Sequence, residues 1–364
     1  MAVTVMLLSR GIGWDKYIHF ISGSMSTGVF AFPARNTNGF FHGGYPENFE
    51  LISREEIHEC SVIPLEPVNI SGRSYFHYLS PEISNLKVDA RMAALLGGSR
   101  PASKVHTRIM AIINATPDSF YPGSRHTVPD KDVDSILDQK PDIVDIGGES
   151  TRPGSTSVSA TEEIERIRPV LDYIASTSRI PVSLDTRHPE VADYFRDRIS
   201  ILNDISGFSD QRMIHIAADS ELQCVVMHMR GTPETMQSMT QYGDLIAETI
   251  KEIQERVIHM MDSGVTSDRI IVDPGIGFAK DTAGNLEILR NIRSYRFGFP
   301  LLVGVSRKAF IGNITSRDVN GRLPGTIALT AYLASEGVDI LRVHDAAENS
   351  DAVKIIEALK NPGS

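Results

Sequence analysis

Polar residues that could bind a small molecule recur along the last two-thirds of the chain. One group supplies hydrogen-bond acceptors, donors and a cation: Asp185, Asn203, Asp273 and Lys308. Such a group suits a flat heterocycle whose edges carry amide and amino functions. A second group carries hydroxyl, guanidinium and imidazole functions: Thr151, Arg152, Arg342 and His344. This second group is typical of a site for an anion such as a phosphate.

Arg342 and His344 are two positions apart, so on a strand their side chains point to the same face and can reach one phosphate. Other ligand-binding motifs fit less well. The sequence has no GxxxxGK[ST] phosphate loop and no recognisable serine or lysine nucleophile triad. Gly275 and Gly277 lack the third glycine of a dinucleotide-binding loop.

Short apolar runs and segments of helical period alternate from Arg108 onward and must position these residues. The apolar runs predict eight strands buried on both faces, at 108–115, 143–147, 181–185, 199–205, 223–229, 270–273, 300–305 and 340–344. Helices are predicted near 130–139, 161–176, 188–197, 210–219, 243–263, 282–292, 324–336 and 346–360.

Eight such units over about 250 residues match an α/β fold of the (β/α)₈ barrel type. A doubly wound open sheet is the competing fold, but it usually has fewer strands and a glycine-rich first turn. In a barrel the carboxyl ends of the strands form the active face. The polar residues named above follow or end the predicted strands, so we expect them to meet at that face.

The composition of the chain argues against several classes of protein. The chain has 364 residues, of which 41% are apolar and 23% charged, which is ordinary for a globular protein. Its net charge of −10 opposes non-specific nucleic-acid binding. Only Cys60 and Cys224 are present, so no disulfide framework is expected, and Cys224 is predicted to be a buried apolar residue. The apolar stretch 3–8 is too short to span a membrane. We expect a cytoplasmic enzyme without nucleic-acid or membrane partners.

The order of the motifs resembles that of the dihydropteroate synthase family. The matching segments are Asn114–Phe120, Asp145–Gly154, Asn203–Ser206, Asp273–Lys280, Ser306–Lys308 and Arg342–Asp345. They cover residues 108–360, about 70% of the chain. The resemblance implies a pterin-binding barrel that joins 6-hydroxymethyl-7,8-dihydropterin diphosphate to p-aminobenzoate and releases pyrophosphate in folate biosynthesis. It also implies a transferase that is a target of sulfonamides and forms a homodimer.

The resemblance assigns roles residue by residue. It implies a pterin pocket formed by Asp185, Asn203, Asp273 and Lys308. The diphosphate anchor would be Asn114, Arg342 and His344, with Asn114 also a ligand of Mg²⁺. Two loops would close over the second substrate, with Asp118 and Phe120 on the first and Thr151, Arg152 and Pro153 on the second. Phe120, Pro153 and Phe278 would wall the aminobenzoate ring, and Asp118, Lys308, Arg342 and His344 would act in catalysis.

The implied chemistry needs electrostatic help for a departing diphosphate and carboxylates that stabilise an electron-poor pterin. It needs no covalent nucleophile. The alternative function is a pterin-dependent methyltransferase module that passes a methyl group to a corrinoid. Arg342 and His344 argue against that alternative, because methyl transfer has no diphosphate to hold. A non-catalytic scaffold is disfavoured because the expected ligand-binding residues are intact.

Some positions depart from the family pattern. The first loop reads Tyr121-Pro-Gly-Ser-Arg125 where the family often has a later glycine pair. Ala309 stands where a serine often helps to hold the aminobenzoate carboxylate, which leaves backbone contacts for that role. Residues 1–107 form an N-terminal extension of unknown role before the barrel at 108–364. Within it, the stretch 20–41 could be an interaction surface or part of a small β module, a helix is predicted at 86–96, and 76–105 could pack on the barrel.

Overall fold

The fold is described from a computed structural model. It covers six strands before residue 80 and residues 106–116, 130–149, 158–295 and 299–360. The chain divides into two compact units. One comprises residues 1–103, 242–258 and 290–299, and the other comprises 104–241, 259–289 and 300–364. The predicted helix at 86–96 and the segment 80–105 lie outside the described residues.

The first unit contains a six-stranded antiparallel sheet, so the small β module considered for the stretch 20–41 is present. Its strands are β1 (Thr4–Leu7), β2 (Lys16–Ile21), β3 (Gly28–Pro33), β4 (Glu50–Ile52), β5 (Ile63–Ile70) and β6 (Arg73–Leu79). The strand order is β4-β3-β2-β6-β5, and β1 pairs with β2. The register of β5 against β6 shifts between Leu65 and Val68, which marks a bulge.

The second unit is built on eight parallel strands, which confirms the predicted barrel. They are β7 (Arg108–Asn114), β8 (Ile143–Gly147), β9 (Val182–Asp185), β10 (Ile201–Asp204), β11 (Gln223–Met227), β12 (Ile270–Asp273), β13 (Leu302–Gly304) and β14 (Ile340–Val343). The pairing order runs β12-β11-β10-β9-β8-β7-β14-β13. An isolated parallel bridge between Val272 and Leu301 joins the two ends of this order and closes the barrel.

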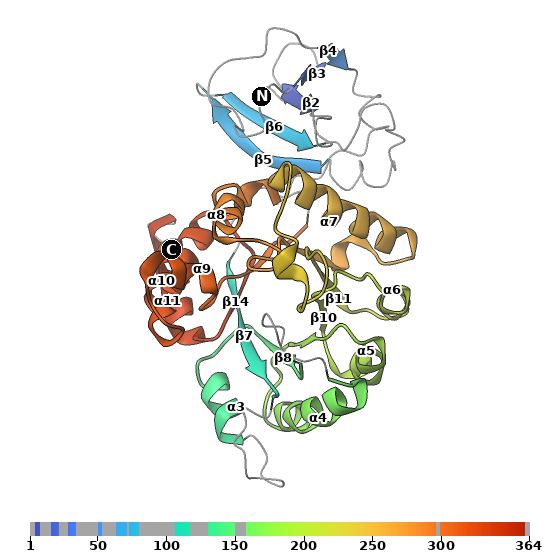
Figure 1. Cartoon of the computed structure of the whole chain (residues 1–364), viewed down its shortest axis with the longest axis vertical. Coiled ribbons are helices and arrows are strands. Elements are labelled where there is room, and N and C mark those ends of the chain that lie inside the picture. The colour runs from blue at the N-terminus through green and yellow to red at the C-terminus, as the bar shows by residue number, and fades with distance from the viewer. Residues whose placement is uncertain are drawn as a thin grey trace. The chain divides into compact units, whose positions relative to one another are not determined.

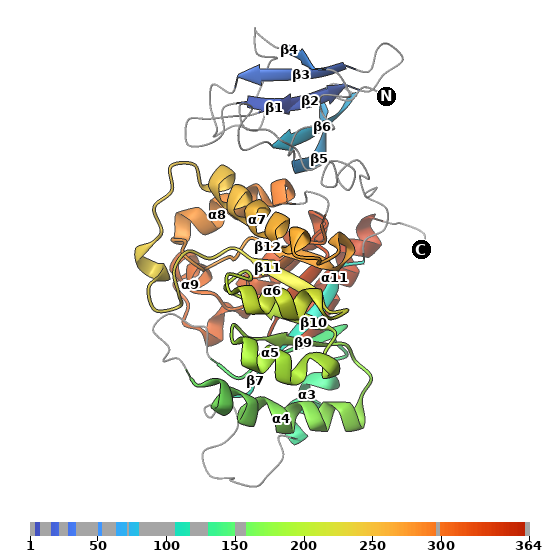
Figure 2. The same ribbon diagram turned by 90° about the vertical axis from the view of Figure 1, so that its right-hand side faces the viewer.

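The helices follow the strands as expected (Figure 1). They are α3 (Asp130–Leu137), α4 (Ala160–Thr177), α5 (Pro189–Phe195), α6 (Gln211–Ala218), α7 (Leu245–Asp262), α8 (Thr282–Arg290), α9 (Ala309–Thr315), α10 (Leu323–Ser335) and α11 (Ala346–Lys360). In Figure 2, α4, α5 and α6 lie side by side outside the strands. Among the described helices, none has both the length and the apolar composition that a membrane crossing requires.

Two of these helices begin at a capping side chain. The Ser159 hydroxyl accepts a hydrogen bond from the Glu162 amide, and the Asp210 carboxylate accepts one from the Arg212 amide. Sequence periodicity missed α9, because its seven residues start immediately after the Ser306–Lys308 motif. This helix ends where Ser316 takes a left-handed conformation, with φ of 55°.

The side chains that point into the barrel form an apolar floor at one level and a polar mouth nearer the carboxyl ends of the strands. The floor is a cluster of buried apolar side chains: Met110, Ile143, Ile201, Val225, Ile271, Leu302 and Ile340. Two residues further along four of these strands, the same inward face carries polar side chains: Asp145, Asn203, Asp273 and Arg342. The floor therefore supports a ring of polar groups at the carboxyl ends of the strands.

Candidate active site

Arg342, near the end of β14, joins the polar residues of two other strands. Its Nε lies 2.5 Å from Asp145 Oδ2 and its Nη2 lies 2.6 Å from Asp185 Oδ2. The Asn203 amide approaches both Asp145 oxygens, at 3.3 and 3.4 Å. Three residues that the sequence placed at the active face, Asp185, Asn203 and Arg342, are thus joined with Asp145 of β8 in one network whose carboxylates and amide are buried.

The charges of this network shift the pKa values of its members, and one carboxylate oxygen of Asp185 remains available to accept a hydrogen bond from a ligand. Burial raises the pKa of Asp185 to about 7, with Arg342 opposing the shift and Asp145 adding to it. Burial acts to lower the pKa of Arg342, but Asp145 and Asp185 outweigh it and raise that pKa above its ordinary value. Among the described residues, no hydrogen bond reaches the buried Oδ1 of Asp185. A ligand N–H group at that oxygen would satisfy it.

Asp273 ends β12, and Lys308 lies in the connection after β13, immediately before α9 and beside the ring of Phe278. Lys308 Nζ donates to the Ile276 carbonyl and lies 4.7 Å from the Phe278 ring centroid. Asp273 Oδ1 accepts a 2.7 Å hydrogen bond from the Gly275 amide. Burial raises the pKa of Asp273 and lowers the pKa of Lys308 to about 8, and each group opposes the other's shift.

The connections after β13 and β14 are joined by two contacts. Ser306 Oγ lies 3.0 Å from His344 Nδ1 and 3.2 Å from the His344 amide. Arg307 forms a two-point ion pair with Asp345, at 2.9 and 2.6 Å. The sequence had no role for Arg307, although it lies within a matched motif. Its φ of 54° turns the chain so that Lys308 follows at the start of α9.

The remaining predicted site residues divide into two groups. Asn114 ends β7, is half-buried, and pairs with Gly147 of β8 in the strand register. Five others lie outside the described residues: Asp118, Phe120, Thr151, Arg152 and Pro153. Their expected roles in the two loops stay predictions, as does the effect of the departures at 121–125.

Sequence reasoning missed an ion pair beside the second of these loops. Glu149 accepts two hydrogen bonds from Arg187, at 2.9 and 3.0 Å, and one at 3.4 Å from the Val158 amide. Glu149 therefore links the residues just before and just after the segment 150–157. The sequence indicated that Glu149 matters, because it belongs to a matched motif. Its partner Arg187 could not be identified, because it lies in the connection after a different strand, β9.

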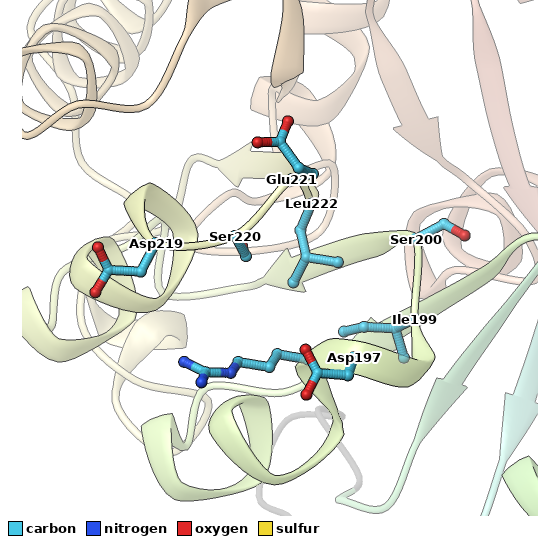
Figure 3. Close-up of a pocket in the computed structure, with 8 residues that line it drawn as sticks. Asp197, Ile199, Ser200, Asp219, Ser220, Glu221 and Leu222 are labelled. Atoms are coloured by element: carbon cyan, nitrogen blue, oxygen red, sulfur yellow. The ribbon is translucent and has the colours of Figure 1, made fainter.

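A pocket of about 560 Å³ lies at the other end of the strands. Its lining comes from the connections 196–200 and 219–222, immediately before β10 and β11. Figure 3 shows the carboxylates of Asp197, Asp219 and Glu221 and the hydroxyls of Ser200 and Ser220 among its side chains. In barrels the amino-terminal face mainly serves stability, so this pocket is separate from the candidate site.

Comparisons with known proteins show which family the barrel resembles. Residues 110–344 match a family model described as "Pterin binding enzyme". The chain is 36% identical to dihydropteroate synthase from Escherichia coli K12 over 258 residues, which are 70% of this chain and 92% of that protein. The solved Xanthomonas albilineans dihydropteroate synthase with 4-aminobenzoic acid is 35% identical, with a TM-score of 0.66 over 70% of this chain and 93% of that one. The Anaplasma phagocytophilum enzyme with bound 6-hydroxymethylpterin-monophosphate is 31% identical, with a TM-score of 0.64 over 70% and 100% of the two chains.

Proposed function

The chain belongs to the dihydropteroate synthase family, and on that premise we propose how its barrel mouth performs the reaction. The enzyme is a transferase of folate synthesis that joins a dihydropterin diphosphate to p-aminobenzoate. The observation that carries the assignment of residues is the network of Arg342 with Asp145 and Asp185, in which Asp185 Oδ1 is left for a ligand. The methyltransferase alternative is not favoured.

The pterin binds between the two carboxylates and Lys308. Asp185 and Asp273 accept hydrogen bonds from ring N–H and amino groups, and Asn203 completes the polar edge. Lys308 donates to a ring acceptor, and the apolar cluster of Ile205, Met227, Met229, Met236 and Ala279, with Phe278 packed against it, contributes the nearby apolar surface. Phe278 also faces the aminobenzoate ring, as expected from the sequence.

Group transfer then proceeds without a covalent enzyme intermediate. The C–O bond between the pterin methylene and the diphosphate breaks, and its electron pair leaves with pyrophosphate. The arylamine nitrogen forms the new C–N bond and loses one proton to solvent. Arg342 and His344 hold the departing anion, and the carboxylates stabilise the positive charge that develops on the pterin. Closure of the two loops would exclude water that would otherwise trap the pterin cation.

Asn114 fits a magnesium site in which the substrate supplies most of the ligands. Mg²⁺ prefers oxygen ligands and is commonly held by one or two protein groups, phosphate oxygens and water. Among the described residues, no cluster of three or more His, Cys, Asp or Glu side chains could hold a metal alone. The Asn114 amide oxygen at the barrel mouth is the donor we assign. When bound, Mg²⁺ would neutralise charge on the diphosphate.

Magnesium removal tests this assignment. Dialysis against EDTA is expected to abolish turnover, and added Mg²⁺ to restore it. Asn114→Ala should raise the Mg²⁺ concentration for half-maximal rate about tenfold, the effect of losing one ligand interaction worth about 1.4 kcal/mol. Asn320→Ala, at an exposed position before α10, is the matched control. An unchanged Mg²⁺ requirement in Asn114→Ala would contradict the assignment.

Pyrophosphate release tests the function itself. With dihydropterin diphosphate and p-aminobenzoate we expect pyrophosphate and dihydropteroate in equal amounts. Without p-aminobenzoate, release should fall to the slow rate of hydrolysis, because no arylamine is present to attack. Sulfonamides, which are also arylamines, should compete with p-aminobenzoate. A methyltransferase or an inactive scaffold would release no pyrophosphate under either condition.

We also propose that the enzyme is a homodimer. Ile355 and Leu359, one helical turn apart on α11, are 64% and 72% exposed, and Tyr332 on neighbouring α10 is 37% exposed. Large apolar side chains that are exposed one turn apart on a helix, as Ile355 and Leu359 are, are typical of a contact surface. Sedimentation velocity should report twice the chain mass, and Leu359→Glu should shift the population to monomer. The cytoplasmic location stays a prediction.

A further inference from the structure

Lys280 carries a buried amino group for which neither the sequence nor the proposed reaction provides a role. It ends the connection that follows β12, and only 3% of the residue is exposed. Its Nζ lies 2.9 Å from His228 Nδ1, 3.0 Å from the Gly275 carbonyl and 2.8 Å from the Phe278 carbonyl. Because an ammonium group donates and cannot accept, a charged Lys280 requires His228 Nδ1 to accept, with the imidazole proton on Nε2.

These contacts fasten the connection 274–280 to the end of β11. The backbone of Gly275 lies so close to His228 that a Cβ atom at this position would come within 2.0 Å of the His228 carbonyl oxygen. The His228 amide in turn donates to the Asp273 carbonyl at 2.9 Å. The same connection presents the Phe278 ring and the Ile276 carbonyl that receives Lys308. The position of the proposed pterin contacts therefore depends on this attachment.

The Lys280 charge also acts on Asp273. Burial raises the pKa of Asp273, and the positive charges of Lys308, Lys280 and Arg342 oppose that shift, together with the Gly275 amide. Lys308 has its own pKa lowered to about 8, so it loses charge as the pH rises above that value. Lys280 is thus a second cation beside Asp273, supplied by the connection that it also fastens.

We propose that Lys280 is a positioning residue of the pterin pocket, which holds the connection 274–280 against His228 and supplies a positive charge beside the Gly275–Asp273 contact. The proposal rests on the proposed function, because it takes Asp273 as a pterin ligand. It assigns His228 the neutral acceptor role at the other end of the same contact.

Lys280→Met tests the role of the charge, because methionine keeps most of the side-chain length and removes the ammonium group. Calorimetric titration with a bare pterin should show binding about tenfold weaker near pH 7. Pterin affinity falls at low pH, and we call this fall the acid limb. Measured from about pH 5 to about pH 9, the acid limb should move to higher pH in Lys280→Met, since Asp273 would protonate more readily. Lys280→Arg should restore the position of that limb. A purely structural role would weaken binding equally at every pH and would overturn the proposal.

The ¹⁵N resonances of His228 give a second readout that does not need the variant to fold. In the wild-type protein we expect an unprotonated Nδ1 and a protonated Nε2 from about pH 6 to about pH 8. A protonated Nδ1 would mean that the imidazole donates to an uncharged Lys280, which overturns the proposal. The same spectra separate titration of His228 from titration of Asp273.

Two controls separate this proposal from the proposed function. Asp273→Asn should weaken pterin binding and remove the Asp273 part of its pH dependence, leaving the part due to Asp185; if it binds pterin as the wild type does, the pocket itself is misassigned. If Asp273→Asn behaves as expected and the limb in Lys280→Met stays in place, only the role of Lys280 fails. Lys354→Met, at an exposed lysine on α11, should change neither binding nor pH dependence.

Discussion

Arg342→Ala is expected to reduce turnover by about 100- to 5,000-fold and to weaken binding of both pyrophosphate and a bare pterin. The guanidinium group neutralises two buried carboxylates, Asp145 and Asp185, in addition to its proposed contact with the diphosphate. Breaking a buried ion pair by removing one partner costs about 3–5 kcal/mol, because the other charge is left uncompensated. Asp185 would then protonate or rearrange, and the pterin would lose a ligand.

The comparison of two ligands makes this test specific. Calorimetry with pyrophosphate and with a bare pterin should show a loss for each, together with a lower midpoint of thermal unfolding. Arg342→Lys should recover part of the pyrophosphate affinity, since it restores one charge but cannot contact both carboxylates as a fork. The control is Arg212→Ala, which removes an exposed arginine that also pairs with two carboxylates, Asp210 and Glu190. Unchanged pterin binding in Arg342→Ala would show that the Asp185 contact is dispensable.

Asp185→Asn is expected to weaken pterin binding by about 10- to 150-fold at neutral pH, the range for losing a charged hydrogen-bond partner. Because burial raises the pKa of Asp185 to about 7, wild-type binding should strengthen as the pH rises through about 7 and the carboxylate forms. The asparagine variant should lack the rise due to Asp185 and keep only the part due to Asp273. Calorimetry between about pH 5 and about pH 9 measures both effects.

Stability gives an independent check on the same carboxyl group. Its folded-state pKa of about 7 lies above the ordinary value of 3.8, so between about pH 4 and about pH 7 the folded protein keeps a proton that the unfolded chain releases. The contribution of Asp185 to the free energy of unfolding is therefore fully present below about pH 4 and is lost as the pH rises to about 7. The stability advantage of wild type over Asp185→Asn should shrink across that interval in urea unfolding. A constant difference would contradict the raised pKa.

Much of the barrel could be predicted because its strands are short apolar runs with polar residues at one end. The observed β8, for example, has the predicted limits Ile143 and Gly147, and β12 has the predicted limits Ile270 and Asp273. Some predicted strands were too long at the end that enters a connection. The strand predicted at 223–229, for example, is β11, which ends at Met227. The prediction was too long because Met229, beyond the strand, is also apolar and packs in a buried cluster with Met227.

The partners of the charged residues could not be predicted in the same way. The sequence placed Arg342 with the anion-binding residues and Asp185 with the heterocycle-binding residues. Their contact depends on β7, which separates β8 from β14 and aligns Met110 with Arg342 on one side and with Ile143 on the other. Such a register between strands far apart in sequence is a property of the closed barrel and is not encoded in any local pattern.

The weakest junction of the barrel wall has a consequence for the ligand. Within the described residues, β12 and β13 are joined by the bridge from Val272 to Leu301, whereas every other pair of neighbouring strands forms a continuous ladder. Asp273 directly follows that bridge on one side, and Lys308 lies beyond it on the other. A pterin held by both side chains would act as a cross-link over this junction. Substrate occupancy should then stabilise the closed wall by mass action, so that part of the enzyme's resistance to unfolding is supplied by its own substrate.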